Sequence, residues 1–251
     1  MDFKAEKDKT KDLFGGSSAW DVEKWSASDD RVRGGKSQSY LEIDDNKAAR
    51  FHGNLDIKTL GGAGFASQKS TVDLDLSDFV AVRLNIAKGD KKRYTFILKD
   101  KLLPKNEDNG REQATISYEA DFTLPSETLP GDAHNRSVVI PFDSLNATYR
   151  GKLQKDAPKI DTKNIKQISL MNRSFFGTQE GGFSLTVSSI TAISKIPKHS
   201  EIVVSRKDGR QLEEQAVESD KVGSQIGNRV RWWMPALLIL AAFVTFRAML
   251  C

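Results

Sequence analysis

The sequence contains few of the residues that build metal centres and disulfides. It has one cysteine, Cys251, and three histidines at positions 52, 134 and 199. A single thiol forms neither an intrachain disulfide nor a thiolate zinc cage. The histidines lack the short spacing of a metal-binding pair. We therefore expect no metal site and no cofactor.

The sequence also lacks an excess of one charge. Lysine and arginine total 38 against 34 aspartate and glutamate, and no basic block is interleaved with aromatics, so no nucleic-acid partner is predicted. The glycine-rich stretch Leu60–Ser70 has neither a P-loop lysine nor a dinucleotide fingerprint, and it is interpreted as a turn entering a strand. A GxSxG elbow is absent as well. These absences predict a protein that is not an enzyme.

The first residues, "MDFKAEKDKTKDLFGG", show neither an apolar secretory signal nor an Arg- and Ser-rich transit peptide. We therefore expect the body of the protein in the cytosol. Glycosylation sequons begin at Asn135, Asn146 and Asn172, and on this expectation they stay bare.

Long apolar runs are absent except for one. No charged residue lies between Trp232 and Phe246. As a helix, the longer stretch from Trp232 to Leu250 would be about 28 Å long, which is enough to cross a bilayer core. Arg229 and Arg231 precede it. We predict a tail anchor at 230–250 with the domain facing the cytosol; a buried core helix and an interfacial helix are the alternatives. The expected lipid-facing residues are Trp232, Trp233, Leu237, Leu238, Ile239, Leu240, Phe243, Val244 and Phe246.

Most of the chain before this run follows a period of two. "VAVRLNIA" (80–87), "RYTFILK" (93–99) and "FSLTV" (183–187) alternate apolar residues with others, and a change of register at Ser188–Ser189 indicates a β-bulge. Further strand-like runs lie at 39–44, 48–53, 64–70, 113–120, 137–142 and 165–172. Only 4–14 and 143–151 are interpreted as helical. The pattern predicts an all-β, antiparallel sandwich of jelly-roll type, followed by the C-terminal transmembrane helix.

The chain is accordingly divided into four parts. Residues 1–13 form a polar N-terminal segment and 14–196 the sandwich. Residues 197–229 have many charges and few large apolar side chains, so they are predicted to be a flexible linker to the anchor at 230–250.

Acidic residues concentrate in "SASDDRVRGGKSQSYL" (26–41), where Asp29 and Asp30 precede Arg31, Arg33 and a glycine pair. Such carboxylates beside a loop sometimes bind calcium, but the alternating ligand pattern of a calcium loop is missing. Asx turns with a surface ion pair are the favoured interpretation.

Four blocks in order resemble one family. "IKQISLMNRSFFGTQEGGFSLTVSSITAI" (165–193) closely resembles the signature of the complex-I-intermediate-associated-protein-30 family. "WSASDDRVRGGKSQSYLEI" (25–43), "ARFHGNLDIKTLGGAGFASQKS" (49–70) and "VVIPFDSLNATYRGK" (138–152) fit it as well. The resemblance runs from about Leu13 to Ile196.

This resemblance implies a galactose-binding-like β-sandwich and a non-enzymatic, chaperone-like role, as in mitochondrial complex I assembly factors that bind membrane-arm intermediates. It implies no catalytic residues. The alternative is a cytosol-facing, tail-anchored recognition module on the ER or another organelle, binding a protein or a glycan-like ligand. A hydrolase on the same sandwich is a third, unsupported hypothesis. The motif positions nominated for partner binding are Asp30, Arg33, Gly34, Gly35, Ser37, Arg173, Ser174, Phe175 and Phe176.

Overall fold

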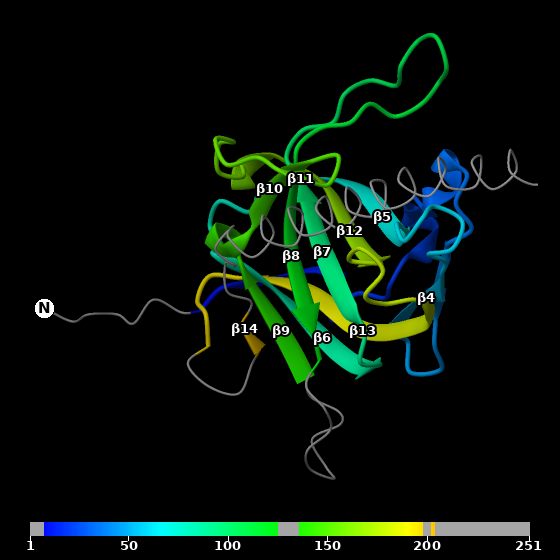
Figure 1. The fold of residues 1–251 in the computed structure, drawn as a ribbon. Coiled ribbons are helices and arrows are strands. Elements are labelled where there is room, and N and C mark those ends of the chain that lie inside the picture. The colour runs from blue at the N-terminus through cyan, green and yellow to red at the C-terminus, as the bar shows by residue number, and fades with distance from the viewer. Residues whose placement is uncertain (1–7, 125–135, 198–201, 204–251) are drawn as a thin grey trace, which may run out of the picture. The chain divides into compact units, whose positions relative to one another are not determined.

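The computed structural model describes residues 8–124, 136–197 and 202–203. They form two packed β-sheets of seven strands each (Figure 1). In the first sheet the order is β14 (Ile202–Val203), β9 (Arg136–Pro141), β6 (Ala81–Gly89), β13 (Gly181–Ile193), β4 (Ala49–Leu55) and β3 (Gln38–Ile43), and β1 (Thr10–Gly15) also pairs with β13.

The second sheet contains the strands that line the candidate site. Its order is β11 (Lys152–Leu153), β10 (Asn146–Tyr149), β8 (Ser117–Thr123), β7 (Arg93–Lys99), β12 (Ile165–Arg173), β5 (Phe65–Leu74) and β2 (Trp25–Ala27). All pairs within it are antiparallel. Short 3-10 helices connect strands: η1 (Val22–Lys24), η2 (Asp30–Arg33), η4 (Phe142–Ser144) and η5 (Thr162–Asn164).

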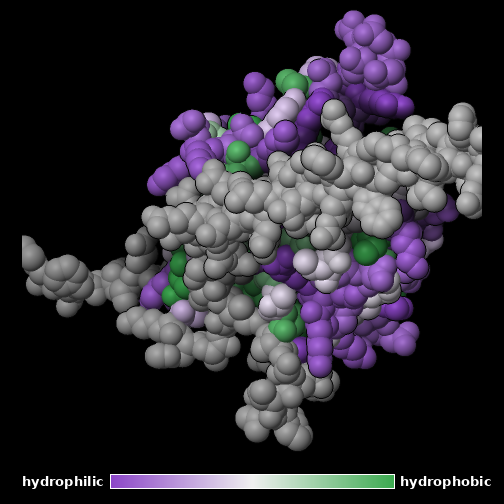
Figure 2. All heavy atoms as spheres, viewed as in Figure 1, coloured by the Kyte–Doolittle hydropathy of each residue, from purple (hydrophilic) through white to green (hydrophobic). Residues whose placement is uncertain are grey.

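The core lies between the two sheets, where the alternating apolar residues of each strand meet. Phe51 of the first sheet meets Tyr94 of the second edge-on, with ring centroids 6.2 Å apart. Phe96 and Leu98 follow Tyr94 at every second position and are fully buried. On the side shown in Figure 2 the described surface is mainly hydrophilic. The period-two pattern thus sets which face of each strand is buried in the sandwich.

The predicted antiparallel β-sandwich is confirmed. The runs at 39–44, 48–53, 64–70, 93–99 and 165–172 lie within or next to β3, β4, β5, β7 and β12. The register of β13 against β6 shifts between Val187 and Ser189, as predicted for a bulge at Ser188–Ser189. Gly61 and Gly62 have φ of 61° and 95° in the turn before β5, which confirms the turn interpretation of the glycine-rich stretch.

The two helix predictions are wrong. Within 4–14, β1 starts at Thr10 and pairs with β13, and Phe14 packs on Trp20 and Trp25 at centroid distances of 5.6 and 4.8 Å. Within 143–151, one 3-10 turn is followed by strand β10. In both places tertiary pairing overrides a weak local preference for helix.

No helix among the described residues is long and apolar enough to cross a bilayer. The predicted anchor at 230–250 and most of the predicted linker at 197–229 lie outside the described residues. Inside that linker stretch, Ile202–Val203 forms β14, which pairs in parallel with β9.

Candidate binding site

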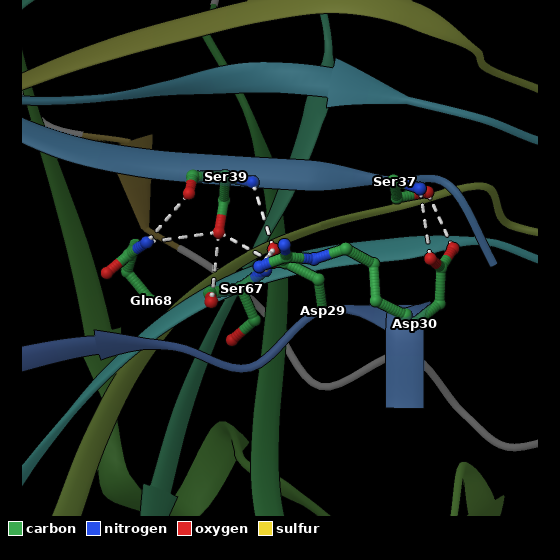
Figure 3. A network of polar contacts seen from close by, with 7 residues as sticks. Asp29, Asp30, Ser37, Ser39, Ser67 and Gln68 are labelled. Carbon is green, nitrogen blue, oxygen red and sulfur yellow. Dashed lines mark hydrogen bonds and ion pairs between the residues drawn. The ribbon is translucent and has the colours of Figure 1, made fainter. Parts of the chain in front are cut away.

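Asp30 is a buried carboxylate that joins the two sheets. It lies at the start of η2 with 1% of its surface exposed. Its Oδ1 accepts a hydrogen bond from the Ser37 amide at 3.0 Å, and its Oδ2 accepts from the Ser37 hydroxyl at 2.6 Å and from the Phe65 amide at 3.1 Å. The carboxylate therefore links the chain just before β3 with the first residue of β5. Figure 3 shows its two bonds to Ser37.

Asp29 repeats this arrangement two residues further along both strands. Its Oδ1 accepts from the Ser39 hydroxyl at 2.6 Å and from the Ser67 amide at 3.0 Å, and its Oδ2 accepts from the Ser39 amide at 3.2 Å. Gln68 donates from its side-chain nitrogen to the carbonyl and hydroxyl oxygens of Ser39. Because each carboxylate accepts one amide at β3 or just before it and one amide of β5, the pair joins the two sheets. We call Asp29 and Asp30 with these donors the aspartate seam.

The seam corrects the interpretation of this stretch as Asx turns with a surface ion pair. Both aspartates are buried, and the ion pair between Arg31 and Asp29, at 3.4 Å, is only one of their contacts. Every carboxylate oxygen already accepts at least one hydrogen bond. Within the described ranges, no three His, Cys, Asp or Glu side chains gather as metal ligands. The seam is therefore an element of the fold.

The glycine pair after η2 makes the seam possible. Gly34 ends the 3-10 helix with φ of 84°, a left-handed conformation that glycine adopts without strain. At Gly35 an added Cβ would lie 2.2 Å from Oδ1 of Asp30. This close approach requires glycine, so both residues position the aspartates.

Ser174 extends the same junction from the other end of the chain. Its hydroxyl accepts from the amide of Gly64 at 3.1 Å, and its amide donates to the Gly64 carbonyl at 2.9 Å. The guanidinium of Arg33 lies 5.7 Å from the ring centroid of Phe65. Three of the motif blocks therefore meet at Gly64 and Phe65.

The turn after Ser174 holds two phenylalanines in an unusual backbone conformation. Phe175 and Phe176 have φ of 44° and 59°, which is uncommon for bulky residues and costs about 1–3 kcal/mol each. The Phe175 ring lies 3.4 Å from the guanidinium carbon of Arg93 and 4.8 Å from that of Arg173. The Phe176 side chain is 78% exposed. Phe175 thus supports two cations, while Phe176 faces solvent.

Arg173 forms ion pairs with two acids on β8. Its two terminal nitrogens donate to Glu119 and Asp121, both at 2.7 Å. Burial alone would lower the pKa of Arg173, but the charges of Glu119 and Asp121 outweigh burial and raise this pKa. The hydroxyls of Thr148 and Thr95 donate to Glu119 and Asp121, each at 2.7 Å.

These groups share one surface, the side of the second sheet that points away from the core. We call it the outer face and define it as the outward side chains of β5, β7, β8 and β12. Cross-strand register places Thr95 opposite Asp121 and Ile97 opposite Glu119. The polar side chains of the outer face include Lys69, Arg93, Thr95, Lys99, Glu119, Asp121, Ser169 and Arg173.

Two cations of the outer face differ from the rest. Lys69 pairs with Glu112, but the side chains of Arg93 and Lys99 have no hydrogen bond or ion pair to any described residue. Both are partly buried. Burial is the main reason that the pKa of each lies below its usual value. Asp121 opposes this shift at Arg93 and Arg173 adds to it, whereas at Lys99 the cation Lys69 adds to the shift and Glu112 and Glu119 oppose it.

The structure therefore brings the nine nominated residues to one end of the sandwich but gives them different roles. Asp30, Gly34, Gly35, Ser37 and Ser174 shape the junction. Arg33, Arg173, Phe175 and Phe176 present side chains beside the outer face.

Sequence reasoning missed four outer-face residues, although a signal for them was present. In "RYTFILK" and "SYEADF" the charged residues occupy the positions opposite the aromatic ones. That alternation could have placed charges together on one face. It could not show which of them are paired. The missed residues are Arg93, Lys99, Glu119 and Asp121.

Together these features describe a two-sheet β-sandwich with a polar, partly buried surface on one sheet. Residues 12–187 match the family of complex I intermediate-associated protein 30 (CIA30). The chain belongs to this family, which is related to complex I assembly, and the resemblance noted from its motifs is confirmed.

The chain is also similar to a protein of Schizosaccharomyces pombe described as uncharacterized protein C9E9.15. The two are 42% identical over 190 residues, which is 73% of this chain and 84% of the relative.

Among solved structures, the chain is similar to the family 11 carbohydrate-binding module of a cellulosomal cellulase from Clostridium thermocellum. The identity is 15% and the TM-score 0.49, with 76% of this chain and 98% of the module covered. The same module in complex with a β-1,3-1,4-mixed-linked tetrasaccharide gives 15% identity and a TM-score of 0.45, with 80% of this chain and 98% of the module covered.

Proposed function

We propose that the protein is a non-catalytic, chaperone-like binding protein that acts in the assembly of respiratory complex I while anchored in a membrane by residues 230–250. The observation that carries this proposal is the match of residues 12–187 to the CIA30 family. The matched span includes three of the four motif blocks entirely and most of the fourth.

The geometry supports a binding role for this domain. Arg173, Glu119 and Asp121 form an ion-pair network on the outer face, and the side-chain donors of Arg93 and Lys99 beside it bond to no described residue. Preorganised polar groups of this kind bind a ligand at low entropic cost. We therefore assign partner binding to the outer face and its Phe175–Phe176 turn.

The assembly role is tested by removing the protein from cells and separating respiratory complexes by native electrophoresis. We expect complex I to decrease, a partly assembled intermediate to accumulate, and the full chain to co-migrate with that intermediate. Re-expression of the full chain should restore complex I, whereas a chain stopped at Asn228 should restore it incompletely. Unchanged complex I in the absence of the protein would refute the role.

A second function is favoured by the apolar run itself. Arg229 and Arg231 precede it, and a basic flank favours the cytosolic side of a membrane. On this alternative the domain is a recognition module on the cytosolic face of the ER or another organelle, binding a protein or a glycan-like ligand.

Protease added to intact organelles separates the two functions. Protection of the domain inside mitochondria supports the assembly role, and digestion at an organelle surface supports the alternative. The sequon at Asn146 adds a check, since it is partly exposed whereas Asn172 is fully buried. A glycan at Asn146 would place the domain in a lumen and exclude the cytosol-facing module.

A further inference from the structure

Strand β7 presents two cations on the outer face whose side chains form no hydrogen bond or ion pair with a described residue, although Asp121 lies near Arg93 and Glu112 and Glu119 lie near Lys99. Arg93 and Lys99 are the first and last residues of this strand and point to the same side, because side chains alternate along a strand. Six strand intervals separate them by about 20 Å. The guanidinium carbon of Arg93 lies over the Phe175 ring, 3.4 Å from its centroid, and this contact positions side-chain donors that bond to no described residue.

An unbalanced, partly buried charge is unfavourable for the folded chain by itself. Burial removes hydrating water from the cation, and folded proteins usually offset this with an ion pair or hydrogen bonds. The acids nearest to these cations are committed elsewhere, because Glu119 and Asp121 pair with Arg173, and Glu112 pairs with Lys69. Two external anions would therefore complete the face.

The charges between the two cations limit what kind of ligand fits. Asp121 and Glu119 lie beside Thr95 and Ile97, midway along β7. A ligand with a negative charge at every unit, such as a nucleic-acid backbone, would place charges against these carboxylates. An extended peptide can instead have acids at two positions six residues apart and neutral residues between them.

We propose that the outer face docks an extended acidic segment of a protein partner, with one carboxylate on Arg93 and a second on Lys99. Arg93 binds a carboxylate with its planar fork of donors, and the exposed Phe176 offers an apolar contact beyond it. This inference rests on the proposed binding function and names the surface and the partner's chemistry.

The test measures binding of a labelled peptide to the full chain in detergent micelles by fluorescence anisotropy. The peptide has the length of β7, seven residues, with glutamate at both ends and serine and threonine between, and its counterpart has glutamine at both ends. We expect saturable binding of the acidic peptide only, weakened by salt. Arg93→Gln and Lys99→Gln should each reduce affinity about tenfold, since a charge-assisted hydrogen bond is lost.

Arg150→Gln is the matched control, because Arg150 also lies over an aromatic ring, that of Tyr149 at 5.5 Å, but is exposed and away from β7. It should leave binding unchanged. A melting curve of each variant distinguishes lost contacts from lost folding. Lys99→Met should melt at the same or a higher temperature than the natural chain while binding the peptide more weakly, because it removes an unbalanced charge.

Three results would overturn the inference. The first is equal binding, or equal lack of binding, of the acidic and glutamine peptides. The second is a Lys99→Met variant that melts at a clearly lower temperature, which would make Lys99 a structural residue. The third is binding of the neutral mixed-linked tetrasaccharide at the outer face that Arg93→Gln leaves unaltered. These measurements use purified protein, so their failure is distinct from failure of the assembly role, which is read from complex I in cells.

Discussion

The aspartate seam and the outer face both contain acidic residues, but these residues have different roles in the two regions. In the seam, Asp29 and Asp30 are buried and accept hydrogen bonds from strand amides and serine hydroxyls. On the outer face, Glu119 and Asp121 are balanced by Arg173, yet the side chains of Arg93 and Lys99 beside them form no ion pair or hydrogen bond with a described residue. Buried charges with all their hydrogen-bonding groups satisfied are expected to serve the fold, whereas buried charges without partners are candidates for binding, as we propose for the outer face.

The largest expected effect concerns the seam. Asp30→Ala leaves three donors, on Ser37 and Phe65, without their acceptor in a buried place, and it should lower the free energy of unfolding by about 3 kcal/mol or more. Urea denaturation measures this. Asp73→Ala is the control, since Asp73 pairs with Lys166 while 85% exposed, and it should change stability by less than about 1 kcal/mol. Similar losses in both variants would contradict a structural role specific to the seam.

The next effect concerns the network of the outer face. Arg173→Met leaves Glu119 and Asp121 without their cation and should lower the free energy of unfolding by about 2 kcal/mol. This loss is smaller than for a fully buried ion pair, because these side chains are partly exposed. Adding Glu119→Gln to this variant should recover part of the loss, because one of the two uncompensated charges is removed. If the second change lowers stability further, the ion pairs do not account for the role of Arg173.

A smaller effect distinguishes the two phenylalanines of the turn. Phe175→Gly removes the ring beneath Arg93 and Arg173 and should lower the free energy of unfolding by about 1–2 kcal/mol, because relief of backbone strain only partly offsets the lost contacts. Phe176→Gly removes an exposed ring and relieves the same kind of backbone strain, so it should leave the free energy of unfolding unchanged or raise it. Thermal melting of both variants makes the comparison. Equal destabilisation would mean that Phe176 is retained for folding.

The smallest effect is a pH dependence at the edge of the first sheet. A backbone hydrogen bond from Ser17 is the main reason that the pKa of Asp12 lies below its usual value of 3.8, and the Thr191 hydroxyl, at 2.9 Å, acts in the same direction. A lowered pKa in the folded state means that Asp12 stabilises the fold above its unfolded pKa and that this contribution is lost as pH falls through the folded pKa.

Asp12→Asn should therefore be less stable than the natural chain near neutral pH, by roughly a few tenths of a kcal/mol because Asp12 is largely exposed. The difference should shrink in acid. Urea denaturation from neutral pH to below the usual carboxyl range measures it. A difference that grows as pH falls would have the wrong sign.

The fold was predictable where strands were long and alternated clearly. "RYTFILK" coincides with β7, and the bulge in β13 follows from the shift between "FSLTV" and Ile190. Strands β1 and β10 were not predictable, because a lysine-rich start and a short polar run have no period of their own and become strands through pairing with β13 and β8.

The candidate site was predictable in part. The family motifs led to Arg173, Phe175 and Phe176, which lie beside the outer face. They led equally to Asp30 and Ser37, whose burial removes them from contact with a partner. The spacing of Asp29 and Asp30 does not indicate that their carboxylates accept hydrogen bonds from amides of β3 and β5. These bonds form only because the two strands, one from each sheet, come together in the fold.

Strand periodicity and motif order were enough to predict a β-sandwich that resembles the CIA30 family, because both can be recognised in the linear order of residues. The alternation along β7 and β8 also predicts which of their side chains share a face. The pairing of charges, by contrast, became visible only in the folded chain. Arg173 reaches Glu119 and Asp121 across β7, whereas Arg93 and Lys99 form no ion pair with a described acid, and such pairing depends on distances that sequence separation does not set.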